Sequence, residues 1–201
     1  MNIGFDLDGV IAQTSEMLIE SVNTKFGSTL PIETFKKYKL EDNIYSEDKA
    51  LNKQAIIYLQ RMIVTPKRLK SIEPYPESVK IINKLKKAGH KIYIITSRPI
   101  KFKELTAVWL RQHGIPFDDF VLTNGLTKGD YAVKFKLDCF VDDLEDNLYD
   151  MYRAKRRWKK GLLLMTQPWN EDIIMDASKY IRVHGWGDIF RCLQMRNRLR
   201  E

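Results

Sequence analysis

The chain has 201 residues, of which 44% are hydrophobic and 11% aromatic. This composition can bury a core and excludes an intrinsically disordered chain, and no apolar run approaches the ~18 residues of a membrane-spanning helix. The formal net charge of +8 is compatible with an anionic substrate or with nucleic acid, and by itself it selects neither.

The first residues and the cysteines indicate an intracellular protein. A strand-like segment begins at Ile3, so we expect no secretory signal peptide. The two cysteines are Cys139 and Cys192, and Cys139 falls within an apolar strand pattern. Reduced, mostly buried thiols are the expected state for such a pair. We therefore expect a cytoplasmic protein without a membrane span.

Short apolar runs predict the buried strands of a parallel sheet. They cover Ile3–Leu7, Lys91–Thr96, Phe120–Thr123, Cys139–Val141 and Leu162–Met165, with a weaker run at Tyr180–Val183. Helical patterns lie between most of them, including Ser78–Ala88, which ends before Gly89, and Lys103–Gln112. This alternation predicts an α/β fold, a three-layer Rossmann-like parallel sheet with helices on both faces.

One connection is much longer than a single crossover helix. More than eighty residues separate the first two predicted strands, and this stretch carries little strand signal. Helices are predicted at Ser15–Phe26 and Lys49–Ile63, with a third, short one at Ile32–Tyr38, before Pro74 and Pro76 mark the return to the sheet. We expect residues 14–72 to form a small helical cap domain, and residues 1–13 and 73–201 to form the core domain.

Two pairs of acidic residues follow predicted strands. Asp6 and Asp8 lie two residues apart after the first strand, so their side chains would point the same way, and Gly9 would allow a sharp turn. Asp142 and Asp143 follow the fourth strand. Solvated acids in an Asp-Gly turn are the simplest explanation of the first pair. Carboxylates gathered at the ends of parallel strands, however, favour a bound cation or a reactive site.

The sequence Asp6-x-Asp8-Gly9-Val10 after the first strand resembles the first motif of the haloacid dehalogenase superfamily, on its phosphatase branch. This resemblance implies that Asp6 attacks phosphorus and that Asp8 protonates the leaving oxygen and then activates water. It also implies that Thr96 and Ser97 hold phosphate oxygens, and Arg98 could add a bidentate contact.

The resemblance further implies a lysine before the fourth strand that neutralises the nucleophile and the phosphate. Lys128 fits best because it precedes a short helix, and Lys134 is the second candidate for a phosphate contact. Asp6, Asp143, Asp142 and the backbone carbonyl of Asp8 are the implied ligands of Mg²⁺, a cation that prefers oxygen.

Within this superfamily the chain resembles the 5'(3')-deoxyribonucleotidase group. The likeness rests on Thr96-Ser97-Arg98-Pro99, on Asp142-Asp143, and on a tail in which Trp169-Asn170 precedes Arg182-Val183 and Trp186. We therefore expect a Mg²⁺-dependent phosphomonoesterase that acts through an aspartyl-phosphate, on a small phosphorylated substrate such as a nucleotide. The sequence does not indicate the oligomeric state.

Three alternatives share this fold. A phosphatase of polynucleotide 3' ends or of other small molecules would use the same chemistry, and a phosphomutase would reuse the phosphorylated aspartate. A non-enzymatic binding protein is the third. The nucleic-acid alternative rests on late basic residues, which are Arg153, Lys155, Arg156, Arg157, Lys159, Lys160, Arg191, Arg196, Arg198 and Arg200.

Overall fold

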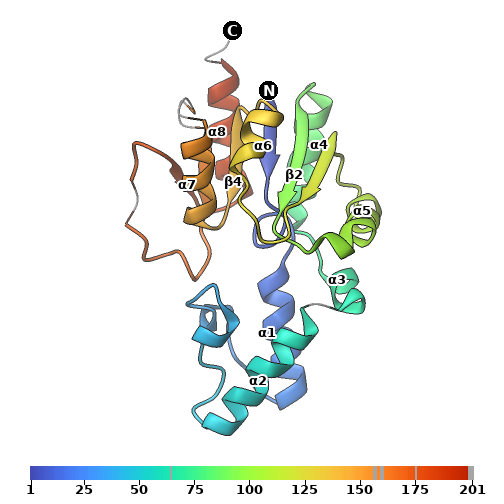
Figure 1. The fold of residues 1–201 in the computed structure, drawn as a ribbon, viewed down its shortest axis with the longest axis vertical. Coiled ribbons are helices and arrows are strands. Elements are labelled where there is room, and N and C mark those ends of the chain that lie inside the picture. The colour runs from blue at the N-terminus through green and yellow to red at the C-terminus, as the bar shows by residue number, and fades with distance from the viewer. Residues whose placement is uncertain (64, 156–157, 159–160, 175, 199–201) are drawn as a thin grey trace.

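A single parallel sheet organises the protein, as seen in a computed structural model that describes residues 1–63, 65–155, 158, 161–174 and 176–198 (Figure 1). Within these residues its six strands have the order β3-β2-β1-β4-β5-β6, and every neighbouring pair is parallel. The strands are β1 (Asn2–Phe5), β2 (Lys91–Thr96), β3 (Asp119–Leu122), β4 (Cys139–Asp142), β5 (Leu162–Met165) and β6 (Ile181–Val183). The predicted α/β class is confirmed.

Helices cover both faces of this sheet, which makes three layers. They are α4 (Pro76–Lys87), α5 (Lys103–Gln112), α6 (Gly129–Lys134), α7 (Glu145–Ala154) and α8 (Trp186–Arg198). Successive residues of β2 alternate between two apolar clusters, as the pleat of a strand requires. Ile92 and Ile94 belong to the cluster that includes residues of α4 and α8, whereas Tyr93 and Ile95 belong to the cluster of α6 and α7.

The first strand ends at Phe5 and not at the predicted Leu7, because only the N–H of Asp6 still pairs with β4, at Val141, and the chain bends from Leu7 onward. The backbone N–H groups of Ile11 and Ala12 both donate to the carbonyl of Leu7, over 2.9 and 2.8 Å. Gly9 lies in this turn with φ of 78°. The turn places Asp6 and Asp8 in a hydrogen-bonded loop at the carboxyl end of the sheet.

The long connection between β1 and β2 is helical and lies beyond the carboxyl ends of the strands (Figure 1). It contains α1 (Thr14–Phe26), two short 3₁₀ helices, η1 (Ile32–Thr34) and η2 (Leu40–Asp42), then α2 (Lys49–Met62) and α3 (Pro66–Ser71). The predicted helix at Ile32–Tyr38 is wrong beyond Thr34. The buried side chain of Asn43 instead forms hydrogen bonds with the backbone of Lys37 and Lys39 and holds this segment as an irregular loop. The sequence did not indicate α3, whose one buried residue, Leu69, gives no periodic pattern.

The two ends of this insertion are joined where they leave and re-enter the core. Gln13 N–H donates to the carbonyl of Glu73, and Tyr75 N–H donates to that of Ile11, both over 2.9 Å. From α5, the indole N–H of Trp109 donates to the carbonyl of Ile72 over 2.7 Å. The insertion is therefore anchored to the core through its two adjacent connecting segments. In the part of the chain described above, no helix is long and apolar enough to cross a membrane.

Close packing between β1 and β4 generates a stability prediction. A Cβ atom on Gly4 would lie 2.8 Å from Cδ2 of Phe140 and 2.9 Å from Cδ1 of Leu137. We expect Gly4→Ala to lower the free energy of unfolding by about 1–3 kcal/mol, because buried side chains would have to move. Gly185→Ala is the matched control, since its Cβ would meet no atom within 4 Å. Urea denaturation that finds the two variants equally stable would contradict this description of the core.

Candidate active site

Acidic side chains from two neighbouring strands meet at the carboxyl end of the sheet. Because β1 and β4 are paired with Phe5 opposite Val141, the residues that follow, Asp6 and Asp142, become neighbours. One carboxylate oxygen from each of Asp6, Asp142 and Asp143 lies within 4.8 Å of the other two. The three residues are only 6%, 0% and 2% exposed. Such a cluster of buried carboxylates requires compensating positive charge.

Lys128 supplies part of that charge. Its ammonium group donates to Oδ1 of Asp6 over 2.8 Å and to Oδ2 of Asp142 over 2.7 Å, and the lysine is fully buried. Lys128 precedes α6, which packs so closely on α7 that a Cβ on Gly129 would lie 2.9 Å from the carbonyl oxygen of Asp150. A larger residue at position 129 would push Lys128 away from the carboxylates.

One ammonium does not balance three carboxylates. Burial and the neighbouring carboxylates raise the pKa of Asp6 and of Asp143 above the usual range, despite the opposing effect of Lys128. Burial alone would lower the pKa of Lys128, but Asp142 and Asp6 outweigh it and raise that pKa. The excess negative charge and the set of convergent oxygen donors fit a hard divalent cation such as Mg²⁺.

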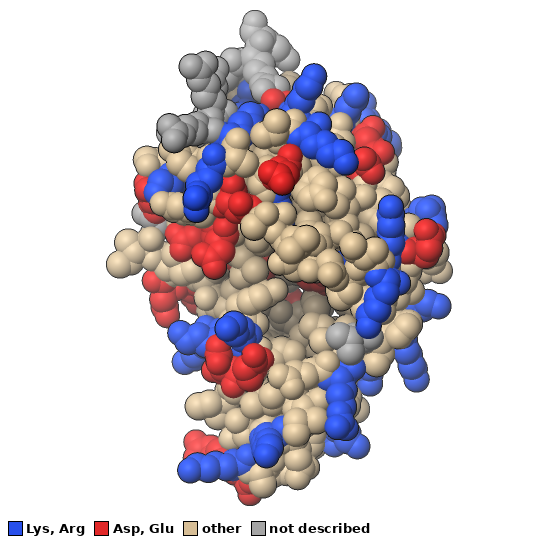
Figure 2. Space-filling model, viewed as in Figure 1, with Lys and Arg blue, Asp and Glu red and all other residues tan. Residues whose placement is uncertain are grey.

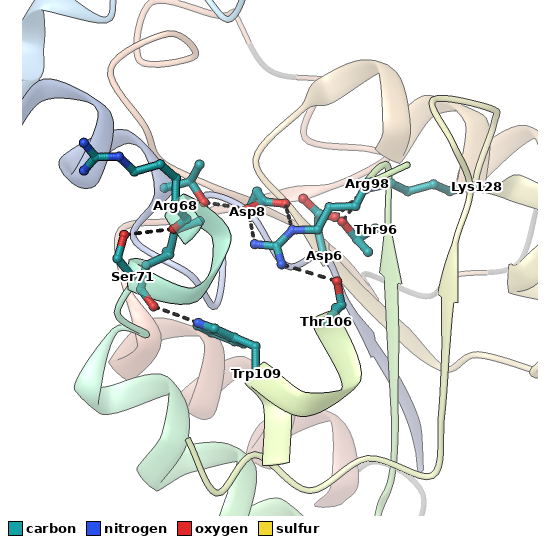
Figure 3. Close-up of polar contacts among 11 residues, drawn as sticks. Asp6, Asp8, Arg68, Ser71, Thr96, Arg98, Thr106, Trp109 and Lys128 are labelled. Carbon is teal, nitrogen blue, oxygen red and sulfur yellow. Dashed lines mark hydrogen bonds and ion pairs between the residues drawn. The ribbon is translucent and has the colours of Figure 1, made fainter. Parts of the chain in front are cut away.

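Asp8 is held by a different set of contacts, drawn in Figure 3. Nε and Nη2 of Arg98 donate to its two carboxylate oxygens over 2.8 and 2.7 Å, and Oγ1 of Thr14 donates to Oδ1 over 2.5 Å. Burial would raise the pKa of Asp8, but Arg98 and the Thr14 hydroxyl outweigh it and lower that pKa. A third nitrogen of Arg98, Nη1, lies 3.5 Å from Oγ1 of Thr106. Arg98, which was predicted to contact phosphate, thus forms a bidentate ion pair with Asp8 in this structure.

The loop after β2 brings Thr96 and Ser97 to the same site. Thr96 is 1% exposed, and its Oγ1 accepts a hydrogen bond from the backbone N–H of Arg98 over 3.3 Å, which leaves the Thr96 hydroxyl hydrogen available as a donor. Gly125, at φ of 77°, donates its N–H to the carbonyl of Ser97 over 3.1 Å. Backbone contacts therefore fix the loop that presents both hydroxyl groups.

Gly9 is needed where the first loop passes the acidic cluster. A Cβ atom on Gly9 would lie 2.7 Å from Oδ2 of Asp143, so a larger residue would displace that carboxylate. The carbonyl of Gly9 accepts a hydrogen bond from Nε2 of Gln167 over 2.6 Å. This contact ties the loop after β1 to the loop after β5.

Polar side chains around the acids hold them in place. Asn147 Nδ2 donates to Oδ1 of Asp142 over 3.0 Å and so helps to orient that carboxylate. Asn170 Nδ2 donates to the backbone carbonyl of Asp143 over 2.8 Å. The roles of Thr14 and Gln167 were not predicted. Thr14 reads only as the start of a helix, and no feature of the sequence connects Gln167 with Gly9.

Lys134, the second candidate lysine, is not brought to the site. It lies on the exposed side of α6, where its ammonium group is 5.7 Å from the ring centroid of Tyr131 and 5.6 Å from that of Phe135. Lys128, in contrast, lies at the beginning of α6 and points into the acidic cluster. Of the two lysines left open by the sequence, the structure therefore places Lys128 against the carboxylates.

Two acids of the cluster, Asp6 and Asp143, lie at one end of a cavity between the core and the insertion. Its volume is about 360 Å³, within the usual range for small-molecule sites. Asp6, Asp143 and Thr96 line it from the core, and Leu18, Phe35 and Tyr38 line it from the insertion. Figure 2 shows a hollow between these two parts of the molecule. The site therefore combines a charged end with an apolar wall.

Four of the late basic residues, Arg153, Lys155, Arg191 and Arg196, have side chains in the described part of the chain. Arg156, Arg157, Lys159, Lys160, Arg200 and the side chain of Arg198 lie outside the described residues. Lys155 donates to the carbonyl of Leu137, and Arg191 pairs with Asp188. Figure 2 shows basic and acidic side chains interspersed on the face that it presents. These contacts are typical of ordinary surface charges.

Solved structures define the class of fold. An L-2-haloacid dehalogenase superposes with a TM-score of 0.58 at 16% identity, and the match covers 96% of this chain and 98% of that one. A protein described as a "predicted phosphatase", from Clostridium acetobutylicum, gives a TM-score of 0.60 at 17% identity, with 96% and 98% of the two chains covered. The fold is that of the haloacid dehalogenase superfamily, as the motif after β1 implied.

The family follows from sequence comparison. Residues 1–199 match the family described as "5' nucleotidase, deoxy (Pyrimidine), cytosolic type C protein", and the chain belongs to this family. A "Putative nucleotidase" from Oceanobacillus iheyensis is 26% identical over 194 residues, which cover 95% of this chain and 98% of that protein. One from Halalkalibacterium halodurans is 22% identical over 183 residues, covering 91% and 87%. The expected phosphatase of 5'-nucleotidase type is confirmed, and the non-enzymatic alternative is not supported.

The buried triad of Lys128, Asp6 and Asp142 generates a second prediction. Lys128→Met removes the positive charge, so in EDTA we expect the free energy of unfolding to fall by about 3–5 kcal/mol. We expect Mg²⁺ to restore part of the loss, because a bound cation replaces the missing charge. Lys134→Met, at the last and exposed residue of α6, should change the free energy of unfolding by no more than about 0.5 kcal/mol. Equal stability of the two variants in EDTA would contradict the importance of this triad.

Proposed function

We propose that the protein is a Mg²⁺-dependent phosphomonoesterase in which Asp6 becomes transiently phosphorylated. The observation that carries this proposal is the position of Asp6, at the charged end of the cavity. Lys128 holds one oxygen of Asp6, Oδ1, and the other is left to act as nucleophile. Asp6, Asp142 and Asp143, with the carbonyl of Asp8, would hold Mg²⁺. When bound, this ion supplies the positive charge that allows a phosphate dianion to approach the acids.

The reaction divides into two displacements. Asp6 attacks phosphorus, the ester P–O bond breaks, and Asp8 gives a proton to the departing alcohol oxygen. Asp8, now ionised, then removes a proton from a water molecule, whose oxygen attacks the phosphorus and releases Asp6. The contacts of Asp8 with Arg98 and Thr14 favour its ionised form, which suits the second displacement. The first displacement requires that these contacts loosen when substrate binds.

The hydroxyl groups after β2 complete the phosphate site in this proposal. Thr96 has a hydroxyl hydrogen available to donate, and Ser97 lines the same cavity. Gly9 contributes by allowing close approach of the backbone to the site. Lys128 neutralises charge on the nucleophile, and Lys134 has no role.

We propose residues 14–72 as a cap domain on a core domain of residues 1–13 and 73–201. The cavity lies between these two parts, so the cap would limit the substrate to one that fits about 360 Å³. A nucleoside monophosphate is the substrate that the family description supports. The family description also supports a cytosolic location.

The proposed nucleophile can be tested with a charge-matched pair of variants. Asp6→Asn should reduce Mg²⁺-dependent hydrolysis of p-nitrophenyl phosphate and of nucleoside monophosphates by at least about 10⁴-fold, because an amide cannot form the phosphorylated intermediate. Asp146→Asn removes an exposed carboxylate from the first turn of α7 and should retain wild-type turnover. Circular dichroism would verify that both variants are folded. Turnover by Asp6→Asn would show that the nucleophile is another residue.

Arg98 is proposed to position Asp8, and this role differs measurably from phosphate binding. Arg98→Lys keeps the charge but loses the two-pronged contact, so kcat should fall about 10-fold or more while KM changes little. Thr14→Val removes the third contact to Asp8 and should lower kcat in the same direction, by a smaller factor. A large increase in KM at unchanged kcat would instead assign Arg98 to the phosphate, as its sequence position suggested.

A further inference from the structure

One aromatic residue of the insertion, Tyr38, lies at the active-site cavity and is not buried in the core of the insertion. Tyr38 lines the cavity that contains Asp6 and Asp143, and it remains 59% exposed. Two other aromatic residues of the same loop, Phe35 and Tyr45, are 2% and 3% exposed and pack edge to face with ring centroids 5.7 Å apart. Phe35 and Tyr45 are thus packed into the core of the insertion, whereas Tyr38 lines the cavity and stays exposed.

The backbone on both sides of Tyr38 is fixed by one buried side chain. Asn43 is 4% exposed, and its Oδ1 accepts a hydrogen bond from the N–H of Lys37 over 2.8 Å. Its Nδ2 donates to the carbonyl of Lys37 over 2.9 Å and to that of Lys39 over 2.7 Å. A buried amide with three backbone contacts is a rigid support, because losing any of them leaves a polar group unpaired. Asn43 therefore determines where Tyr38 projects.

The phenol of Tyr38 is close enough to the acids to be affected by their charge. Desolvation, together with Asp143, Asp6 and Asp8, raises the pKa of Tyr38 above its usual value. A tyrosine phenol is protonated at neutral pH even without such a shift, so Tyr38 can donate a hydrogen bond. Tyr38 lines the same cavity as the acids Asp6 and Asp143 and as the apolar residues Leu18 and Phe35, and it can offer both a hydroxyl group and a ring to a ligand there.

We propose that Tyr38 determines substrate specificity by contacting the alcohol portion of the phosphomonoester, and that Asn43 is the residue that positions it. The proposal rests on the phosphomonoesterase function proposed above. The phosphoryl group would be held by the core at the charged end, so a group attached to it extends toward the insertion. The hydroxyl group of Tyr38 can donate a hydrogen bond, and its aromatic ring can pack against a flat or apolar group. A nucleoside offers both partners, because its sugar carries oxygen acceptors and its base is flat.

Binding measurements on a non-hydrolysing protein separate this role from catalysis. In the Asp6→Asn background, with Mg²⁺ present, calorimetry would give the dissociation constants of deoxythymidine 5'-monophosphate and of inorganic phosphate. Adding Tyr38→Ala should weaken nucleotide binding about 10-fold, the effect of losing one hydrogen bond and one ring contact. It should change phosphate binding less than about 2-fold, because the proposal assigns Tyr38 to the alcohol portion of the substrate and not to its phosphoryl group.

Further variants distinguish the ring, the hydroxyl group and the support. Tyr38→Phe keeps the ring and should lose only part of the nucleotide affinity. Asn43→Ala should weaken nucleotide binding as Tyr38→Ala does, without weakening phosphate binding. Ile44→Ala is the control, since Ile44 is 72% exposed in the same loop and does not line the cavity. It should leave both dissociation constants unchanged.

The possible failures are distinguishable. If Tyr38→Ala binds nucleotide as tightly as its parent, or loses phosphate affinity equally, the specificity role is wrong and the phosphomonoesterase proposal stands. If the wild-type protein hydrolyses no phosphomonoester with Mg²⁺ and the Asp6→Asn protein binds neither ligand, the proposed function fails, and the role of Tyr38 fails with it.

Discussion

The contact between one buried ammonium and two buried carboxylates is the constraint on which the site depends. Lys128 lies 2.8 Å from Asp6 and 2.7 Å from Asp142, and all three side chains are almost inaccessible to water. Isolated charges of this kind would be very costly to bury, so each is tolerable only because the others are present. With Asp143 added, the cluster still carries excess negative charge. That excess is the physical reason to expect a divalent cation beside the nucleophile.

The other half of the chemistry depends on how distant segments meet at Asp8. Arg98 comes from the loop after β2, and Thr14 begins the first helix of the insertion, so core and insertion both hold the same carboxylate. A movement of the insertion would therefore change the contacts of Asp8, the residue proposed to act as both acid and base. The same insertion presents Tyr38 on a loop supported by Asn43. Recognition of the substrate and control of proton transfer thus share one structural element.

Much of the core and its acids could be predicted from sequence, because both depend on local pattern. Apolar runs mark the strands, and acids directly after parallel strands gather at one edge of the sheet. The contacts that could not be predicted are tertiary. Arg98 and Asp8 are 90 positions apart, and only the fold shows that this arginine contacts an aspartate. The loop around Tyr38 has no periodic sequence pattern, because its backbone is held by hydrogen bonds to the side chain of Asn43 and not by a helix or a strand. The choice between Lys128 and Lys134 likewise required the orientation of α6.

A crystal structure of the protein with Mg²⁺ and beryllium fluoride, which mimics a phosphorylated aspartate, tests these ideas most directly. We expect a single cation bound between Asp6 and Asp143, and a trifluoroberyllate group bonded to the carboxylate oxygen of Asp6 that Lys128 does not hold. A cation elsewhere, or a fluoroberyllate group on a different residue, would show that these carboxylates do not form the reactive centre.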